Sequence, residues 1–445
     1  MSDQTKADPA RLVAWQTLQA VSRDDAYANL VLPRKLAEAK LSGRDAGLAT
    51  ELGYGTLRAR GTLDEILRRC STRSLDDIEL GVLDLLRLGA YQLLKTRVPN
   101  HAAVATTVEL AKATGHGRSS GFVNAILRKV TAHDFDAWCD QIAGQASELG
   151  RLALRYSHPG WIVGAFAEVL PDEELEAALA ADDTRPETHL VAWPGRVERG
   201  VLAEQAGGEA GPYSPYAVRL TQGGDPGSLA PVRDHQAGVQ DEGSQLCALA
   251  LTRITPIEQG ETWLDLCAGP GGKAALLAAL AEHNGATLTA NELHPHRAEL
   301  VAAATAPWSV DIRTGDAREL DGQFERILLD APCTGLGALR RRPEARWRRD
   351  PGDLADLVEL QSELLDAAFR LLKPGGVLAY VTCSPHPAET IDQVDAVLAR
   401  HPELRLLDAR PVFADVDQLD DTDTVQLWPH RHGTDAMFCA VLTKG

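Results

Sequence analysis

The sequence lacks the long apolar run that a membrane-spanning helix needs, and its first residues lack the charged-then-apolar pattern of a signal peptide. Its seven cysteines form no Cys-x-x-Cys pair and no zinc-ligand spacing. An odd, scattered set of cysteines is typical of thiols that stay reduced. We therefore expect a cytoplasmic protein with no membrane partner and no metal site.

The sequence also lacks the overall positive charge of many nucleic-acid-binding proteins. Its formal net charge is −18, and contacts with phosphates require lysine and arginine. Basic residues nevertheless gather at Arg34–Lys35, at Arg128–Lys129 and in the dense run Arg340–Arg349. Local basic sites on an acidic body are compatible with an RNA substrate.

Apolar residues recur at helical spacing through the first part of the chain, up to about residue 135. Prolines there are confined to positions near expected helix starts or in loops. This pattern predicts an all-helical bundle with helices at Arg11–Val21, Ala46–Arg60, Leu63–Arg69, Ile78–Leu94, Ala102–Ala113 and Gly121–Val130.

Two further kinds of sequence follow. Between about residues 140 and 235, the segments Thr188–Trp193, Val197–Gln205 and Tyr216–Thr221 alternate as strand, helix and strand in a βαβ-like order, which predicts a small α+β domain. From about residue 236, strand, turn and helix repeat, which predicts an α/β Rossmann-like, doubly wound sheet. The predicted division is therefore 1–138, 139–235 and 236–445, and the predicted strands of the last part are Thr262–Leu266, Thr287–Asn291, Ser309–Thr314, Arg326–Leu329 and Val377–Val381.

The last part opens with a strand, a glycine-rich turn and a helix over Trp263–Lys273 and beyond. Glycines let the backbone approach a ligand closely, and the helix N-terminus attracts its anionic end. The next two strands end at Glu292 and Asp316, where one acid can accept from ribose hydroxyls and the other from an adenine N–H. Both acids could instead cap helices. The pattern favours an adenosine-containing ligand, and the departure from Gly-x-Gly-x-x-Gly counts against a dinucleotide.

Two cysteines follow neighbouring predicted strands on this ligand-binding side. Cys333 comes after Asp330, and Cys383 follows the fifth strand. A single cysteine at such a place is usually inert packing, but a pair suits covalent chemistry. A thiolate that adds to C6 of cytosine makes C5 nucleophilic, and a second thiol can assist breakdown of the adduct. A protonated or proton-sharing Asp330 could hydrogen-bond N3. The spacing leaves open which thiol attacks.

The sequence resembles two known families. Glu51–Arg58, Leu86–Leu93 and Gly121–Lys129 are similar to signatures of NusB-like domains, which bind RNA and protein partners. Asp265–Lys273, Asp330–Gly335 and Thr382–Ser384 resemble three ordered motifs of the NOL1/NOP2/Sun family of RNA cytosine-C5 methyltransferases, and Val239–Gln245 matches the helix before its cofactor loop.

This resemblance implies a class I S-adenosyl-L-methionine-dependent methyltransferase acting on small-subunit ribosomal RNA, without DNA as a partner. It implies Cys383 as the nucleophile and Cys333 as the residue that assists product release. It also implies a set of residues that line the S-adenosylmethionine site: Cys267, Ala268, Gly269, Pro270, Gly271, Gly272, Lys273, Glu292, Asp316 and Asp330.

Two departures from the family pattern stand out. Gly269 takes the place of a common alanine, which we expect only to loosen the turn, and Gly433–Cys439 replaces the usual segment before the last strand. We expect Gly335–Arg342 to contact an RNA backbone, with a solvated loop as the alternative, and Trp347 to pack or to stack on a base. Two other functions stay open: a tRNA cytosine-C5 methyltransferase, and a non-catalytic, NusB-like RNA-binding antitermination protein.

Overall fold

The computed structural model describes residues 7–445, so the first six residues, part of the stretch behind the signal-peptide expectation, lie outside it. The chain forms two compact units: residues 1–185 with 339–348, and residues 186–338 with 349–445. The predicted boundaries after residues 138 and 235 do not coincide with this division, because helices from 135 to 183 belong to the first unit. The three-domain division stays a prediction. Within residues 7–445, no helix is both long enough and apolar enough to cross a bilayer.

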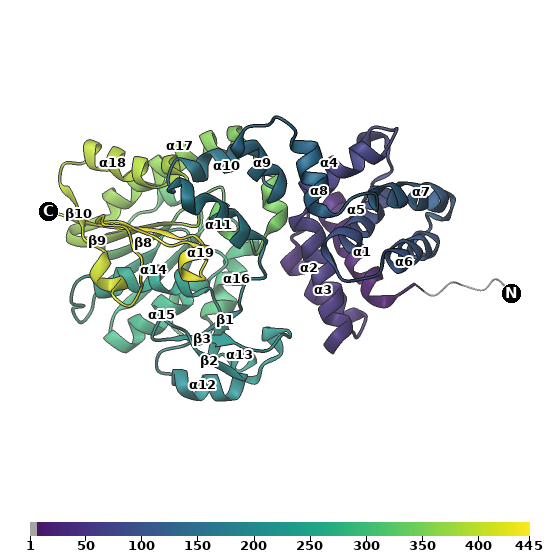
Figure 1. Cartoon of the computed structure of the whole chain (residues 1–445). Helices are drawn as coiled ribbons and strands as arrows, with labels where there is room; N and C mark the ends of the chain where they lie inside the picture. Colours follow the sequence, from purple (N-terminus) through teal and green to yellow (C-terminus); the bar gives the residue numbers. More distant parts are fainter. Residues whose placement is uncertain (1–6) are drawn as a thin grey trace. The chain divides into compact units, whose positions relative to one another are not determined.

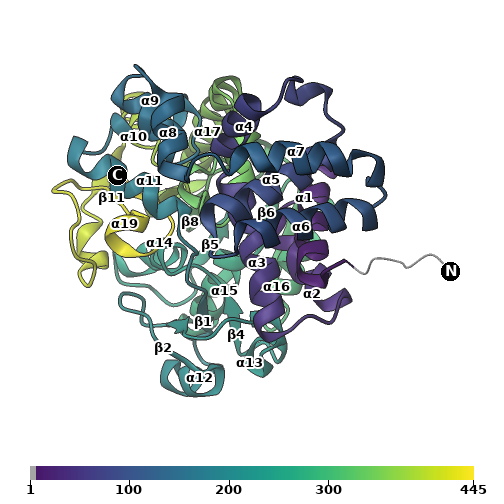
Figure 2. The same ribbon diagram turned by 45° about the vertical axis from the view of Figure 1, so that its right-hand side comes forward.

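The first unit is built from helices around a core of leucine, isoleucine and valine (Figure 2). Helix α1 begins at Pro9, where the Asp8 side chain accepts from the backbone N–H of Arg11. The six predicted helices are confirmed within a few residues, and α2 was missed because Pro33 lies inside it. The helices are α1 Pro9–Asp24, α2 Ala28–Glu38, α3 Gly43–Arg58, α4 Arg60–Cys70, α5 Leu80–Lys95, α6 Asn100–Ala113, α7 Ser120–Val130, α8 Phe135–Ala143, α9 Glu148–Arg155, α10 Gly160–Ala167 and α11 Asp172–Asp183.

The basic run Arg340–Arg349 folds largely into this helical unit. Arg346 is completely buried; its guanidinium donates to the carbonyl oxygens of Arg58, Tyr156, Ser157 and Asp182 and pairs with Asp183 at 3.0 Å. Arg340 is also buried. Trp347 packs so closely on Gly61 that a Cβ there would lie 2.2 Å from its ring. The expected RNA contact is therefore wrong for Arg340, whereas Trp347 is partly exposed and packs the edge of its ring on Gly61.

The second unit begins with a small four-stranded sheet in the order β2-β3-β1-β4. The predicted strands and helix are confirmed, but the βαβ-like reading is wrong in its topology. Strand β1 pairs antiparallel with both β3 and β4, because the short strand β2 follows the helix and reverses the chain before β3. The elements are β1 His189–Ala192, α12 Arg199–Ala206, β2 Gly208–Ala210, β3 Ala217–Leu220, α13 Ala230–Arg233 and β4 Ala237–Val239.

The larger sheet has the order β10-β12-β9-β8-β5-β6-β7, with β11 paired to β12. Strands β5 to β9 are parallel, as predicted, and β12 pairs antiparallel with β9 on one side and with β10 on the other. The altered segment Gly433–Cys439 therefore still leads into a regular last strand. The elements are α14 Glu242–Arg253, β5 Thr262–Asp265, α15 Gly272–Asn284, β6 Thr287–Glu292, α16 Pro295–Thr305, β7 Val310–Thr314, β8 Phe324–Asp330, α17 Pro351–Leu371, β9 Leu372–Thr382, α18 Ile391–Arg400, β10 Leu404–Leu407, β11 Val425–Gln426, α19 Pro429–His432 and β12 Phe438–Lys444.

Helices cover both faces of this sheet (Figure 1). Trp263 on β5 joins the core that contains α14 and α15, whereas the next residue, Leu264, joins the core that contains α17. Successive side chains of a strand point to opposite faces, so a strand buried on both sides is apolar at every position. The chain passes from β5 to β6 and β7 on one side, then returns to β8 on the other. In doubly wound sheets, ligands bind in the crevice at such a reversal, outside the carboxyl ends of the strands.

Candidate functional site

The sequence-predicted site residues gather at the carboxyl ends of the parallel strands. The glycine turn lies between β5 and α15, Glu292 ends β6, Asp316 follows β7, Asp330 ends β8, and Cys383 follows β9. The sheet order makes β8 the neighbour of both β5 and β9. Asp330 therefore lies between the glycine turn and the second cysteine, which is the geometry needed for a cofactor beside a reacting group.

The two candidate thiols lie next to each other. The sulfur atoms of Cys333 and Cys383 are 3.4 Å apart, close enough for one S–H to donate to the other sulfur. The backbone holds both loops in place, since Ala331 N–H donates to Val381 and Gly337 N–H donates to the Cys383 carbonyl. A Cβ on Gly337 would lie 1.9 Å from the Ala436 carbonyl oxygen, so this close approach requires glycine.

A partly buried ion pair lies beside the thiols. Lys273 Nζ donates to Asp330 Oδ2 at 2.8 Å, and the lysine side chain is only 10% exposed. Burial alone would lower the pKa of Lys273, but the negative charge of Asp330 and the hydrogen bond to it raise the pKa above its usual value. Lys273 therefore holds a positive charge at neutral pH. Any thiolate at Cys383 gains from this charge.

The two thiols differ in their surroundings. The hydrogen bond with Cys383, burial, and the nearby charges of Cys383 and Glu389 all raise the pKa of Cys333 well above its usual value. The positive charge of Lys273 thus favours a thiolate at Cys383, whereas the carboxylate of Glu389 disfavours one at Cys333. This asymmetry favours a thiol at Cys333 and directs any ionisation of the pair to Cys383.

The glycine turn meets Glu292 closely. Gly269 N–H donates to Oε2 of Glu292 at 3.1 Å, and His294 N–H donates to Oε1 at 3.0 Å. A Cβ at residue 269 would lie 2.1 Å from that Oε2. Glycine here does more than loosen the turn, because it lets the carboxylate approach the loop. Gly271 has a φ of +109° and faces α16, where a Cβ would lie 2.7 Å from Ala304.

The two remaining acids of the crevice differ in exposure. Asp316 accepts from the backbone N–H and the guanidinium of Arg318, and these hydrogen bonds lower its pKa. Asp316 also caps the short helix Ala317–Glu319, the alternative role that its position allowed. Asp265 at the end of β5 is completely buried. Burial, with the nearby Asp330 charge, raises the pKa of Asp265 to about 8.

Comparison with known proteins covers both parts of the chain. Residues 252–443 match the family model of the 16S rRNA methyltransferase RsmB/F, and residues 8–132 match that of the NusB family. A Mycobacterium tuberculosis protein named as a methyltransferase, Rv1407, is 55% identical over 98% of this chain and 97% of its own length. The ribosomal RNA small subunit methyltransferase B of Cronobacter sakazakii is 33% identical over 98% of each chain.

The chain belongs to the RsmB/F family of 16S rRNA methyltransferases. The solved structure of PH0851 has the same fold, with a TM-score of 0.83 at 22% identity over 98% of this chain and 99% of that chain. The chain is therefore a methyltransferase with a NusB-type helical region, and S-adenosylmethionine is the methyl donor of the family.

The crevice of the methyltransferase suits S-adenosylmethionine. Helix α15 starts at Gly272, and its N-cap residue Gly271 has no side chain to cap it. The first N–H groups of the helix can therefore receive the carboxylate of the donor. Each oxygen of Glu292 accepts one backbone N–H and keeps a lone pair for a ribose hydroxyl. The close contacts of Gly269 with Glu292 and of Gly271 with α16 leave no space for side chains, so the loop packs tightly against the acid that would bind the ribose.

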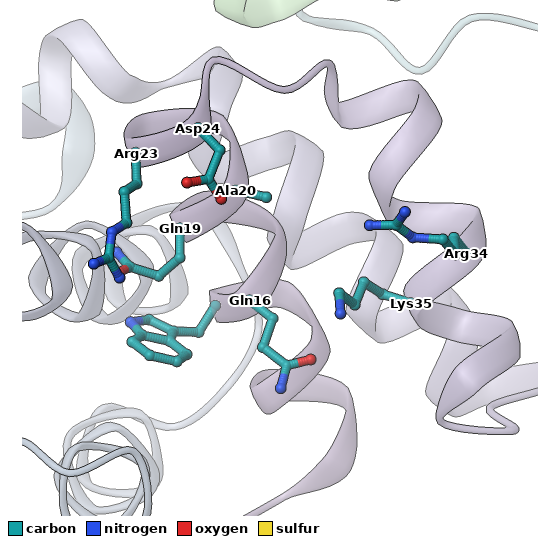
Figure 3. A pocket seen from close by; sticks show the side chains of 8 residues that line it. Gln16, Gln19, Ala20, Arg23, Asp24, Arg34 and Lys35 are labelled. Atoms are coloured by element: carbon teal, nitrogen blue, oxygen red, sulfur yellow. The ribbon is translucent and has the colours of Figure 1, made fainter.

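The helical unit carries a separate hollow between α1 and α2 (Figure 3). Gln16, Gln19 and Arg23 line it from α1, and Arg34 and Lys35 line it from α2. Both basic residues of α2 form ion pairs with Glu38, at 3.6 and 3.0 Å. On α7, Arg128 is exposed, whereas Lys129 donates to the Cys70 carbonyl. Arg128 thus remains available to a phosphate.

Two features of the site escaped sequence reasoning. The pairing of Lys273 with Asp330 needs the sheet order, which no local pattern reveals. The buried Glu389 lies beyond Cys383 in the stretch Pro385–Thr390, whose local pattern suggests nothing more than a turn. Across residues 7–445, no group of three His, Cys, Asp or Glu side chains could hold a metal ion.

Proposed function

We propose that this methyltransferase methylates C5 of a cytosine in small-subunit 16S ribosomal RNA through a covalent adduct of Cys383 with C6. The observation that carries the proposal is the 3.4 Å separation of the Cys333 and Cys383 sulfur atoms beside the Lys273–Asp330 ion pair. The names of the relatives support the RNA substrate. When bound, S-adenosylmethionine supplies an electrophilic methyl group.

The charges around the thiols support the assignment of their roles. Lys273 stabilises a thiolate at Cys383, and Glu389 opposes one at Cys333. In the proposed reaction the Cys383 thiolate adds to C6, and the electron pair displaced from the C5–C6 double bond makes C5 nucleophilic. Asp330, whose second carboxyl oxygen is not bonded to Lys273, passes one proton from solvent to N3 as negative charge develops there, and returns it when the thiolate leaves. C5 then accepts the methyl group.

Release moves one proton from C5 to sulfur. As the C5–H bond breaks, its electron pair forms the C5–C6 double bond, and the pair of the C6–S bond returns to the Cys383 sulfur. Cys333 gives its S–H proton to that departing sulfur and takes up the C5 proton. Both cysteines end as thiols, and Cys383 loses its proton to solvent before the next turnover. Covalent activation thereby divides one difficult step into easier ones.

The test replaces each thiol separately. Cys383→Ala should abolish methyl transfer to small-subunit RNA, whereas Cys333→Ala should accumulate a covalent RNA adduct that survives a denaturing gel. Full activity of the first variant would refute the nucleophile. Clean turnover of the second variant without an adduct would remove Cys333 from the release step.

The substrate is tested by mapping the methylated nucleotide in RNA from cells with and without the gene. A modified cytosine in 16S ribosomal RNA supports the proposal, and one in tRNA supports the alternative methyltransferase. Binding of S-adenosylmethionine in a calorimeter separates both enzymes from a non-catalytic RNA-binding protein. The exposed Arg128 and the NusB-type match make the helical unit the expected RNA-contacting region.

A further inference from the structure

The loop that carries Cys333 has no place in the sheet. Strand β8 ends at Asp330, and the segment up to Gly335 has no helical or strand structure. The position of the Cys333 thiol therefore depends on the contacts that the residues before and after it make. Pro332 and Thr334 flank Cys333, and both are bound by the same small group of buried side chains.

Glu389 is the centre of that group. It is completely buried, and its Oε1 accepts from Thr334 N–H at 2.8 Å while its Oε2 accepts from the Thr334 hydroxyl. Gln361 on α17 donates both to Oε1 of Glu389, at 3.1 Å, and to the Pro332 carbonyl, at 2.8 Å. Thr334, after Cys333, is thus bound directly to the Glu389 carboxylate. Pro332, before Cys333, is linked to the same carboxylate through the Gln361 amide.

The same network holds the segment after Cys383. Glu389 ends the short helix Pro387–Glu389, and Tyr380 on β9 donates its hydroxyl proton to the Glu389 carbonyl at 2.8 Å. Ser384, next to Cys383, lies 3.3 Å from the Thr334 hydroxyl oxygen. Since that hydroxyl donates to Glu389, Ser384 is the donor in this contact. The residues that follow each cysteine are therefore linked to each other.

A negative charge on the buried Glu389 carboxylate destabilises the folded state, which suggests that the charge has a functional role. Its hydrogen-bond donors among the described residues are all neutral, and a buried carboxylate without a cation costs several kcal/mol of desolvation. Replacing a buried charge with neutral groups of similar shape is often neutral or stabilising, so stability alone does not explain a carboxylate at this place. An anion near Cys333 keeps that sulfur protonated, which release by proton donation requires.

We propose that Glu389 is a positioning residue for product release, which holds Cys333 against Cys383 through Thr334 and Pro332. The proposal rests on the proposed function of Cys333. Glu389 acts late in the reaction, on breakdown of the adduct, and has little effect on attack by Cys383.

The test compares four variants in one adduct assay with small-subunit RNA and S-adenosylmethionine. Glu389→Ala should accumulate covalent RNA adduct at least 10-fold above the unaltered protein, as Cys333→Ala does, while the rate of adduct formation changes less than about 3-fold. Thr334→Val removes one donor to Glu389 and keeps the backbone N–H, so it should accumulate adduct to a smaller extent. Glu261→Gln alters another buried glutamate of the same unit, bonded to Arg326 and Trp263, and should lower stability without accumulating adduct.

The outcomes separate the two proposals. If Cys333→Ala traps adduct but Glu389→Ala and Thr334→Val release product normally, the positioning role is wrong and the proposed chemistry stands. If Cys333→Ala releases product cleanly, the proposed chemistry fails first. Adduct in Glu261→Gln would show that any destabilisation traps RNA, which also overturns the role of Glu389. Should Glu389→Ala fail to fold, Thr334→Val decides alone: release at the unaltered rate contradicts the proposal.

Discussion

The ammonium of Lys273 lies 2.8 Å from a carboxylate oxygen of Asp330, although one residue lies in the first turn of α15 and the other ends β8. The pair joins the cofactor loop to the strand that leads into Cys333. It also brings a positive charge near Cys383 in a poorly solvated place, where electrostatic effects are strong.

Lys273→Met keeps the apolar stem and removes this charge. We expect single-turnover methylation at saturating S-adenosylmethionine to slow roughly 10- to 100-fold, because the Cys383 thiolate loses its cation. Lys373→Met is the matched control, since Lys373 pairs with Glu325 at the opposite end of the strands. Equal losses in both variants would contradict a specific effect of Lys273.

Glu292→Gln should weaken binding of S-adenosylmethionine. An amide offers one acceptor oxygen, so either Gly269 or His294 would face an N–H group in place of an acceptor. Loss of one charged hydrogen bond costs about 1.5–3 kcal/mol, which raises the dissociation constant by roughly 10- to 100-fold. Calorimetry measures this change directly. Glu299→Gln, an exposed acid on the neighbouring helix α16, should bind as the unaltered protein does.

Asp265 should make stability depend on pH. Its pKa rises from 3.8 to about 8 on folding, so the folded chain holds a proton that the unfolded chain has lost. Folding therefore takes up a proton in this window, and stability falls as the pH rises through it. Asp265→Asn cannot ionise and should flatten the curve of unfolding free energy between pH 5 and 8 by a few kcal/mol. Asp311→Asn, an exposed acid on β7, should leave the curve unchanged.

Arg346→Ala should destabilise the helical unit without changing how RNA binding depends on salt. It leaves four carbonyl oxygens and Asp183 without their donor, and breaking a buried pair costs about 3–5 kcal/mol. Thermal unfolding measures the loss. Arg349→Ala, from the same run but partly exposed, should change stability by less than about 0.5 kcal/mol. A weaker salt dependence of RNA binding at normal stability would contradict this buried structural role and indicate that Arg346 contacts RNA.

The presence and approximate bounds of the parallel strands were predictable, because strand, turn and helix alternate regularly along this part of the chain. The same rule brought Asp330, Cys333 and Cys383 to one edge. It works because the carboxyl ends of parallel strands always meet there.

Long-range burial was not predictable. A run dense in arginine is usually solvated, and only contacts with α3 and α11, far away in sequence, reveal Arg346 as a core residue. Glu389 escaped for the same reason, since its partners lie 28 and 55 positions away. The antiparallel pairing of the small sheet depended on β2, which is only three residues long.

The segment Leu339–Arg348 belongs to the helical unit, whereas the residues on either side of it belong to the methyltransferase unit. No single cut in the gene can therefore separate the two. A fragment starting at residue 186 would contain Leu339–Arg348 without the carbonyl oxygens that Arg346 binds. A fragment ending at residue 185 would lack the buried Arg346 side chain that forms part of its own interior. To express the two units separately, the methyltransferase fragment needs a new linker that joins Ala338 to Arg349. The helical fragment needs residues 339–348 added as a separate peptide.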